Sequence, residues 1–525
     1  MRVKKKPVTL AEAPVHPGLR RYLYLTATIT GGAIMIVEIL GAKMLSPYLG
    51  TSHFVWTAQI AVTLVALASG YYVGGWLVDR SSHLGRLYVA ILLAGLYLAL
   101  TIPLVEKTAY SFLQFQDLAV GSLLTSTTLY FVPLSLLAMV GPFCIRVMTS
   151  SVSGVGGNVG RLSALSTLGS FAGTVLIGYL IIPHLPNSIT MYGTAMLLGL
   201  VAVVYFLIWG RGSGPRNGAV TALTVAGLLG YAGARAERWE GKNAEEIFRG
   251  NSNFGLLQVL QTKNGPERYY LNDYLYQNTY STTEQKSISM FTYMLHGLAK
   301  AYAPQVNDVL CIGLGVGIVP MDFARDGARV DVVEINPAVV PVGQRFFNMD
   351  PAQLHITIAD GRQYVNQCSK QYDAVILDAF LGDSCPSHLM TREAFAAMRR
   401  ILKPEGVLVI NTFAELDGDK NFFGTSLFRT LTNVFSSVLV HAGRNGNTLF
   451  VGSAKPNLAM VHAPDYSQVS TNCIGLVEDA FTHVQHPDAN AGIILTDDYN
   501  PVEARDAINR EKLRRSLARR AKGLE

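Results

Sequence analysis

Several acidic residues in the second half of the chain follow short apolar runs at a spacing that suits nucleoside binding. The run VNDVLCI leads into a glycine-rich loop, Gly313-Leu314-Gly315-Val316-Gly317, which lets a ligand approach the backbone. Glu334 follows Gly317 by 17 residues and ends the next apolar run, where a carboxylate can accept both ribose hydroxyl groups. Asp360-Gly361 ends the third run, within reach of an adenine amino group. Together these residues predict a bound nucleoside.

Asp378 ends a fourth apolar run, YDAVILD, and is the strongest candidate for a catalytic residue. A carboxylate delivered by an apolar strand is partly desolvated, so it can act as a general base or bind a cationic group. The alternative is a helix cap or a residue that orders the following loop, 379–386. Asp383 lies in that loop, and its residue type fits either function equally well.

Positioning these residues together requires a parallel sheet. The apolar runs that begin at residue 306 alternate with stretches that suit helices, a pattern that predicts a doubly wound, mostly parallel sheet. Its ligand is expected at the carboxyl ends of the strands. The stretches that suit helices lie near residues 320–326, 338–347, 361–368 and 391–402.

The second half of the chain is therefore predicted to be an α/β Rossmann-like domain of the methyltransferase type. We assign it to residues 306–455 and expect a small β subdomain over residues 253–305, where short β-type runs occur. A C-terminal extension, 456–525, completes the chain.

Composition separates this half from the first. The 525 residues are 50% hydrophobic and 15% charged, with a mean hydropathy of +0.27, whereas soluble domains average about 25% charged residues. Long apolar runs almost free of charge fill residues 22–209, which excludes an ordinary soluble protein. The five cysteines are scattered, so we expect neither a disulfide framework nor a metal site. Because much of the net charge of +6 lies in the N-terminal tail, we expect no nucleic-acid partner.

The first half is predicted to be an α-helical transmembrane bundle over residues 22–234, with the lipid bilayer as its partner. A helix that crosses the hydrocarbon core needs about 20 apolar residues. A further segment, 219–234, is shorter, so the bundle has six or seven spans, and residues 235–252 would link it to the globular half. Segments of the required length are 22–45, 55–78, 87–105, 119–145, 163–183 and 188–209.

Arginine and lysine residues predict the orientation of this bundle. The tail, residues 1–21, and the loops on its side carry nearly all of the positive charge, and Lys107 alone lies in the loops of the other side. This asymmetry predicts a cytoplasmic N-terminus and a multi-pass protein of the cell membrane. Six spans return the chain to the cytoplasm, and the basic residues Arg235, Arg238 and Lys242 favour a cytoplasmic globular domain.

Glu38 lies inside the first predicted span. An ionisable side chain there is costly unless it is paired or hydrated, so it is a candidate functional residue. We favour a structural ion pair with Lys43 or Arg146 over a role in transport.

The order of the motifs resembles the spermidine synthase family of polyamine aminopropyltransferases. The glycine loop, Val333-Glu334-Ile335-Asn336-Pro337, Asp360-Gly361 and the L-D-A-F-x-G-D stretch of residues 377–383 occur in the family's order. The chain is most similar to bacterial members fused to a multi-span membrane domain, which implies the bacterial inner membrane. Two further stretches, 271–277 and 494–498, resemble the family's L-D-G-x-x-Q motif and a tail element of the fused members.

The resemblance implies transfer of the aminopropyl group of decarboxylated S-adenosylmethionine to an amine such as putrescine, which leaves methylthioadenosine. On this interpretation Asp378 is the base, Glu334 holds the ribose, Asp360 and Gly361 hold the adenine, and Gln277 contacts the nucleoside. Asp378 and Asp383 would bind the amine. The oligomeric state stays open, a homo-oligomer included.

Three departures from the family pattern concern the amine. Val316 and Leu381 stand where the family has carboxylates that hold amines, and the family's Y-H-E stretch is not recognisable in residues 290–294. A dication needs carboxylates in its pocket, so the resemblance does not extend to putrescine specificity. Two other functions therefore stay open: an S-adenosylmethionine-dependent methyltransferase, and a polyamine or nucleoside sensor or transporter without turnover.

Overall fold

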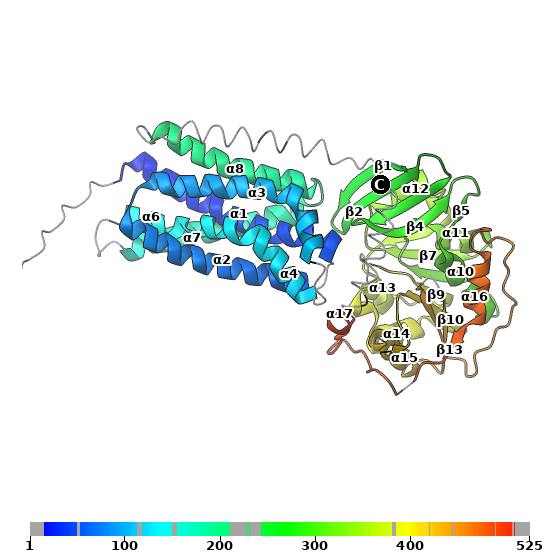
Figure 1. The fold of residues 1–525 in the computed structure, drawn as a ribbon. Coiled ribbons are helices and arrows are strands. Elements are labelled where there is room, and N and C mark those ends of the chain that lie inside the picture. The colour runs from blue at the N-terminus through cyan, green and yellow to red at the C-terminus, as the bar shows by residue number, and fades with distance from the viewer. Residues whose placement is uncertain are drawn as a thin grey trace, which may run out of the picture. The chain divides into compact units, whose positions relative to one another are not determined.

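The computed structural model divides the chain into two compact units, Met1–Glu237 and Arg238–Glu525 (Figure 1). The predicted tail before residue 15, most of segment 219–234, residues 235–242 and Asp383 lie outside the described residues. The structure describes residues 15–49, 53–112, 118–149, 155–210, 243–380, 385–418, 421–443, 446–488 and 490–506, with the single positions 227, 230 and 509.

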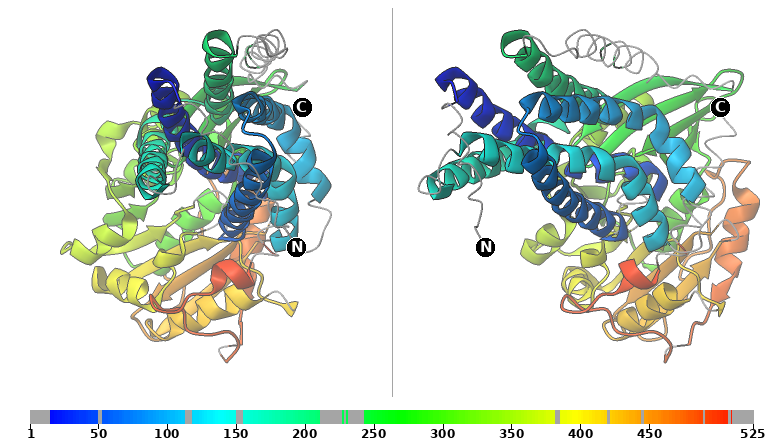
Figure 2. Two further views of the ribbon diagram at one scale, coloured as in Figure 1. Left: turned by 90° about the vertical axis from the view of Figure 1, so that its left-hand side faces the viewer. Right: turned by 60° about the vertical axis from the view of Figure 1, so that its left-hand side comes forward.

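Helices make up the described part of the first unit, and they pack as a bundle (Figure 2). Six helical stretches in this part are long and apolar enough to cross a membrane, and they coincide with the six predicted segments. Helix α1 begins at Pro17, so the end of the predicted tail is helical. The elements are α1 (Pro17–Leu49), α2 (His53–Arg80), α3 (Leu84–Phe112), α4 (Leu118–Ser126), η1 (Thr127–Phe131), α5 (Val132–Ala138), α6 (Val140–Met148), α7 (Val155–Val175), η3 (Leu176–Ile181) and α8 (Asn187–Ile208).

Glycines allow the close approach of α1 and α7. A Cβ atom on Gly169 would lie 2.0 Å from the carbonyl oxygen of Thr28, and one on Gly173 would lie 2.5 Å from that of Gly32. These contacts leave no room for any side chain, so small residues are required here, as in membrane helix pairs. Gly178, five residues further on in the π-helical turn η3, meets nothing within 4 Å.

A small antiparallel sheet opens the described part of the second unit, in the order β1-β2-β3-β4-β5. Its first strand covers the second half of segment 235–252, which the sequence had led us to expect as a linker. This part of the segment forms a strand although it lacks a long apolar run, because β1 is a polar edge strand. The strands are β1 (Ala244–Ser252), β2 (Gly255–Thr262), β3 (Glu267–Asn272), β4 (Leu275–Ser281) and β5 (Lys286–Ser287).

The larger sheet has the strand order β13-β11-β12-β10-β9-β6-β7-β8. Strands β8, β7, β6, β9 and β10 run parallel, and β12 joins β10 in the antiparallel direction. These strands are β6 (Asp308–Ile312), β7 (Arg329–Glu334), β8 (His355–Ile358), β9 (Tyr372–Leu377), β10 (Leu402–Thr412), β11 (Ser437–Ala442), β12 (Thr448–Ser453) and β13 (Val484–Gln485).

Helices alternate with the parallel strands, and apolar clusters lie on both faces of the sheet. This arrangement confirms the predicted Rossmann-like, methyltransferase-type fold, including the four predicted helical stretches. The C-terminal extension is part of the same unit, since β13 pairs with β11. The helices are α10 (Met290–Tyr302), α11 (Ile318–Arg325), α12 (Val339–Phe346), α13 (Gly361–Gln367), α14 (Arg392–Arg400), α15 (Phe422–Thr432), α16 (Ile474–Thr482) and α17 (Val502–Arg505).

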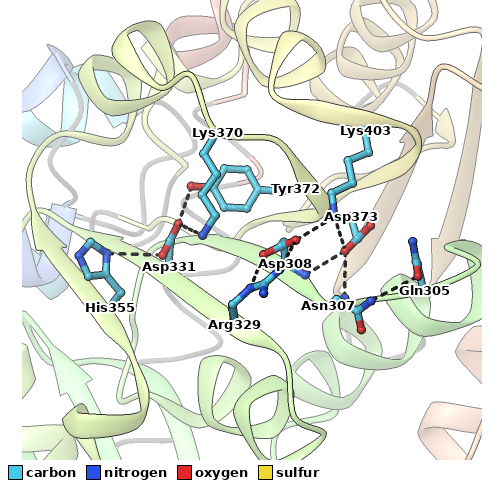
Figure 3. A network of polar contacts seen from close by, with 10 residues as sticks. All are labelled: Gln305, Asn307, Asp308, Arg329, Asp331, His355, Lys370, Tyr372, Asp373 and Lys403. Atoms are coloured by element: carbon cyan, nitrogen blue, oxygen red, sulfur yellow. Dashed lines mark hydrogen bonds and ion pairs between the residues drawn. The ribbon is translucent and has the colours of Figure 1, made fainter.

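Ion pairs tie the amino ends of the parallel strands together (Figure 3). Lys403 Nζ contacts Asp308 at 2.8 Å and Asp373 at 2.9 Å, and Arg329 also binds Asp308. The Arg329 guanidinium and the Lys403 ammonium hold the pKa of Asp308 well below its usual range. Asp331 forms a second cluster with Lys370, Tyr372 and His355. These contacts belong to the edge of the sheet opposite the predicted ligand edge.

Candidate functional site

A cavity of about 230 Å³ lies at the carboxyl ends of β6, β7 and β9 and is also lined by β3 and β4. Because parallel strands end at the same edge of a sheet, residues far apart in sequence meet here. Gly317 does not line this cavity, and Asp383 lies outside the described residues. The predicted site residues that line it are Gln277, Gly313, Gly315, Glu334, Asp360, Gly361 and Asp378.

The glycine loop connects β6 to α11 in a left-handed backbone conformation. Gly313 has a φ of +99°, and a Cβ atom there would lie 2.3 Å from the carbonyl oxygen of Asp378. Gly317 has a φ of +87° and precedes α11, where a Cβ atom would lie 2.4 Å from Met349 Sδ. Gly313 therefore permits close contact with the strand of the candidate base, whereas Gly317 permits the turn into the helix.

Glu334 ends β7 with its carboxylate buried in the cavity wall. Its Oε2 accepts a hydrogen bond from the Leu314 N–H (2.9 Å), and its Oε1 accepts one from the Asn336 N–H (2.7 Å). Burial raises the pKa of Glu334, although these two N–H groups oppose the rise. Each carboxylate oxygen can accept more than one hydrogen bond, so both keep an acceptor position for a ribose hydroxyl.

Asp360 caps the N-terminus of α13, accepting a hydrogen bond from the Gln363 N–H at 2.9 Å. Its other oxygen lies 3.1 Å from His388 Nε2. Burial disfavours the charged form of Asp360, but the Gln363 N–H and the His388 ring outweigh burial and lower its pKa. The neighbouring Gly361 keeps the start of α13 close to β6, since a Cβ atom there would lie 2.6 Å from Ile312.

Asp378 follows β9 and is held by two successive hydrogen bonds from amide side chains that no sequence motif marked. Asn411 Nδ2, on the adjacent strand β10, donates to Asp378 Oδ1 at 2.9 Å, and Asn447 Nδ2 donates to Asn411 Oδ1 at 2.9 Å. Burial raises the pKa of Asp378 to about 6, against the lowering effect of the Asn411 hydrogen bond. A carboxylate with this pKa is suited to general-base chemistry near neutral pH.

Replacing Asn411 should change the pH dependence of any reaction that uses Asp378 as a base. Asn411→Leu removes a donor that stabilises the carboxylate, so the pKa of Asp378 should rise and the acid limb of kcat/KM should move to higher pH. The measurement is a pH–rate profile. Thr412→Val is the matched control, because the Thr412 hydroxyl donates to the Thr448 carbonyl instead. An unchanged limb in Asn411→Leu would contradict the positioning role.

A β-bulge brings Gln277 to the cavity. The pairing of β3 with β4 skips Gln277, and Tyr276, Gln277 and Asn278 all line the cavity. Successive side chains of a regular strand point to opposite faces, so the bulge is what lets three neighbours reach one site.

Asn278 is a further site residue that no sequence motif marked. Its amide nitrogen lies 3.6 Å from the position of a Cβ atom on Gly315, and it lines a smaller pocket together with Asp378. Its buried Oδ1 has no hydrogen-bond partner among the described residues. A buried acceptor of this kind points to a ligand with an N–H or O–H group.

Aromatic rings form part of the cavity wall. Phe380 and Phe413 lie with their ring centroids 5.4 Å apart, and Phe254 and Phe291 also line the cavity. Val316 is fully buried in the core. The part of the lining that the structure describes contains neither Lys nor Arg.

Comparisons with known proteins find similarity mainly to polyamine aminopropyltransferases. Residues 289–433 match the family model for the spermine/spermidine synthase domain. A polyamine aminopropyltransferase of Vibrio vulnificus is 37% identical over 119 residues, which are 22% of this chain and 40% of the relative. A probable polyamine aminopropyl transferase of Bifidobacterium longum is 27% identical over 314 residues, 54% of this chain and 66% of the relative. The matches thus span less than two thirds of these relatives.

Two further similarities concern parts of the chain. An N-terminal histidine N-methyltransferase of Emericella nidulans is 29% identical over 184 residues, 34% of this chain and 29% of the relative. The crystal structure of a probable spermidine synthase from Corynebacterium glutamicum has a TM-score of 0.38 at 18% identity, covering 50% of this chain and 98% of that one.

The matched region contains most of the cavity wall. It begins in the loop before α10 and ends after α15, so it includes the glycine loop, Glu334, Asp360, Asp378 and Asn411. Residues 289–433 are therefore similar to the spermine/spermidine synthase domain, and parts of the chain are similar to polyamine aminopropyltransferases.

Proposed function

We propose that the protein is a membrane-anchored transferase that moves the aminopropyl group of decarboxylated S-adenosylmethionine to an amine and releases methylthioadenosine. The observation that carries this proposal is the Asp378 carboxylate, held by Asn411 at the edge of a nucleoside-sized cavity, with its pKa raised to about 6. In the same cavity, Glu334 would accept the ribose hydroxyls, while Asp360, Gly361 and Gln277 would contact the rest of the nucleoside.

Asp378 would act on the acceptor amine. The amine nitrogen attacks the propyl carbon bound to the sulfonium, a C–N bond forms, and the C–S bond breaks with its electron pair going to sulfur. The nitrogen loses one proton, which the Asp378 carboxylate accepts. Holding both reactants in line lowers the entropic part of the barrier, and the proton transfer contributes a further factor of about 10² to 10⁴.

The charge of the cavity favours a donor without a carboxylate. The described lining contains neither Lys nor Arg, and the loop residues 381–384, Leu-Gly-Asp-Ser, add no cation. The carboxylate of S-adenosylmethionine would therefore find no Lys or Arg partner, and His388 already contacts Asp360. An unpaired carboxylate is costly in a partly desolvated site. The ammonium of the decarboxylated donor could instead bind the Asn278 carbonyl oxygen.

Methyl transfer is the second candidate. Val316 replaces the family's carboxylate in the glycine loop and is buried in the core, so one group that holds the aminopropyl amine in the family is missing. The similarity to the N-methyltransferase of Emericella nidulans also favours methyl transfer.

Product analysis tests the proposal. The purified full-length protein is incubated with decarboxylated or intact S-adenosylmethionine and a panel of amines, and the products are separated by mass. We expect methylthioadenosine from the decarboxylated donor. Formation of S-adenosylhomocysteine would establish methyl transfer. Binding of a donor without any product would favour the hypothesis of a sensor or transporter.

Three described carboxylates line the cavity, and two of them, Glu334 and Asp360, are assigned to the nucleoside in this proposal, which leaves Asp378 for the amine. We therefore propose low activity on putrescine, with Asp383 as the second amine-binding carboxylate. Asp383→Asn should then reduce turnover of diamines more than turnover of monoamines.

We also propose that the first unit anchors the protein in the bacterial inner membrane with its N-terminus in the cytoplasm. The support is the presence of six helices of sufficient length and apolarity together with the asymmetry of positive charge. Reporter fusions after Leu185 and after Arg211, which flank α8, should report opposite sides of the membrane. Reports from the same side would exclude α8 as a span.

A further inference from the structure

Polar side chains gather inside the first unit, where α1, α2 and α4 with its continuation η1 pack together. We call Glu38, Gln59, Ser122, Ser126 and Tyr130 the buried polar cluster. All except Glu38, which is partly buried, have no exposed surface. The opposite side of α2 is exposed and apolar, as shown by Leu64, Val65 and Tyr72. A polar interior behind an apolar exterior is expected of a membrane bundle that has a functional interior.

Gly41 on α1 brings two members of the cluster, Gln59 and Tyr130, together. A Cβ atom on Gly41 would lie 2.8 Å from Gln59 Nε2 and 3.0 Å from Tyr130 Cε2. Glu38 precedes Gly41 by about one helical turn, and its side chain hydrogen-bonds Thr63, which follows Gln59 by one turn on α2. Glu38, Gln59 and Tyr130 therefore converge on one place between three helices.

The ion pair that the sequence analysis favoured for Glu38 is not found. Neither Lys43 nor Arg146 interacts with Glu38 in the described part of the chain, where Thr63 is its side-chain partner. This prediction was wrong. Because a carboxylate in a membrane interior is costly without a cation, Glu38 still requires a compensating group.

Five polar atoms of the cluster also have no hydrogen-bond partner among the described residues: both amide atoms of Gln59, the Ser122 and Ser126 hydroxyls, and the Tyr130 hydroxyl. Neighbouring hydroxyls behave differently. Thr125, for example, donates to the carbonyl of Gly121 at 2.8 Å. Ser122, Ser126 and Tyr130 recur every four residues and so lie on one helix face. Tyr130 belongs to the π-helical turn η1, and such turns are frequent at functional sites.

We propose that the buried polar cluster binds a small cation that carries an ammonium group. An ammonium has three N–H donors and no acceptor, so it can donate to the Glu38 carboxylate, the Gln59 amide oxygen and the Tyr130 hydroxyl together. Its charge also compensates Glu38, whereas an anion would be repelled. This site does not depend on the transferase activity proposed for the second unit.

The test uses the full-length protein in lipid nanodiscs with Asp378→Asn as the background, so that amine binding at the globular cavity is weakened. The probe is methylammonium. Trp56, Trp76 and Trp209 lie in or next to the helices of the first unit, so tryptophan fluorescence reports its thermal unfolding. A ligand that binds the folded state raises the midpoint as its concentration increases.

We expect a saturable rise of the midpoint with methylammonium. Glu38→Gln and Gln59→Leu, which preserve size, should each weaken the apparent affinity by about tenfold or more. Thr194→Val is the matched control: this buried hydroxyl on α8 donates to the Thr190 carbonyl, so the variant should respond as the parent does. Direct binding of radiolabelled methylammonium provides a second measurement for any variant with altered stability.

Four outcomes would overturn the proposal. The first is the absence of a methylammonium-dependent shift and of bound radiolabel. The second is an unchanged response in Gln59→Leu. The third is a shift produced by sodium but not by methylammonium, which would assign the cluster to an alkali cation. The fourth is a higher midpoint of thermal unfolding in Gln59→Leu without ligand, combined with no effect of any ligand on the midpoint. The buried polar groups would then only destabilise the fold, and the proposal would fail.

Discussion

Asp378→Asn should lower kcat by about 10² to 10⁴, because the amide keeps the size of the carboxylate but cannot accept the proton of the attacking amine. Binding of the nucleoside part of the donor should persist, since Glu334 and Asp360 are separate groups of the cavity wall. The measurement is methylthioadenosine release at saturating donor and amine. Equal turnover in the variant and the wild type would remove Asp378 from the mechanism.

The pH dependence provides an independent check on the same residue. In the proposed mechanism Asp378 acts in its carboxylate form, and burial raises its pKa to about 6. Activity should therefore be low below pH 6, rise near pH 6 and level off above it. Ionisation of the acceptor amine can add a separate limb to the profile. In Asp378→Asn the limb near pH 6 should be absent from the residual activity. A limb that persists unchanged would have to come from another group.

Glu334→Ala should weaken binding of an adenosyl sulfonium compound roughly 10- to 150-fold. This range corresponds to the loss of about 1.5 to 3 kcal/mol for a hydrogen bond to a charged group. The change also removes the acceptor of the Leu314 and Asn336 N–H groups, so part of the effect comes through the glycine loop.

Titration calorimetry with the full-length protein measures this effect. Glu334→Gln separates charge from shape, and should bind with intermediate affinity because it keeps one acceptor oxygen. Glu405→Ala is the control, since Glu405 is exposed and pairs with Lys455 far along the sheet from the cavity lining. Wild-type affinity in a folded Glu334→Ala protein would place the ribose elsewhere.

The sequence by itself determined the two-part organisation and most of the candidate site. Apolar runs long enough to form membrane helices need no partner to be recognised, because length and composition alone are diagnostic. Gly313, Glu334, Asp360 and Asp378 could be predicted to meet because each follows a strand of one parallel sheet, and all such strands end at the same edge. The fold class follows from the same alternation of strands and helices.

The tertiary structure alone decided which neighbours surround these residues. Asn411 reaches Asp378 because β10 lies next to β9 in the sheet. The order of strands in a sheet cannot be predicted from the local residue pattern of either strand. Gln277 and Asn278 face the cavity together because a bulge changes the side-chain alternation of β4. The partner of Glu38 depends on how three helices pack. Local periodicity determines which face of an element is apolar, whereas hydrogen-bond partners between elements depend on packing across long sequence distances, so they emerge only in the folded chain.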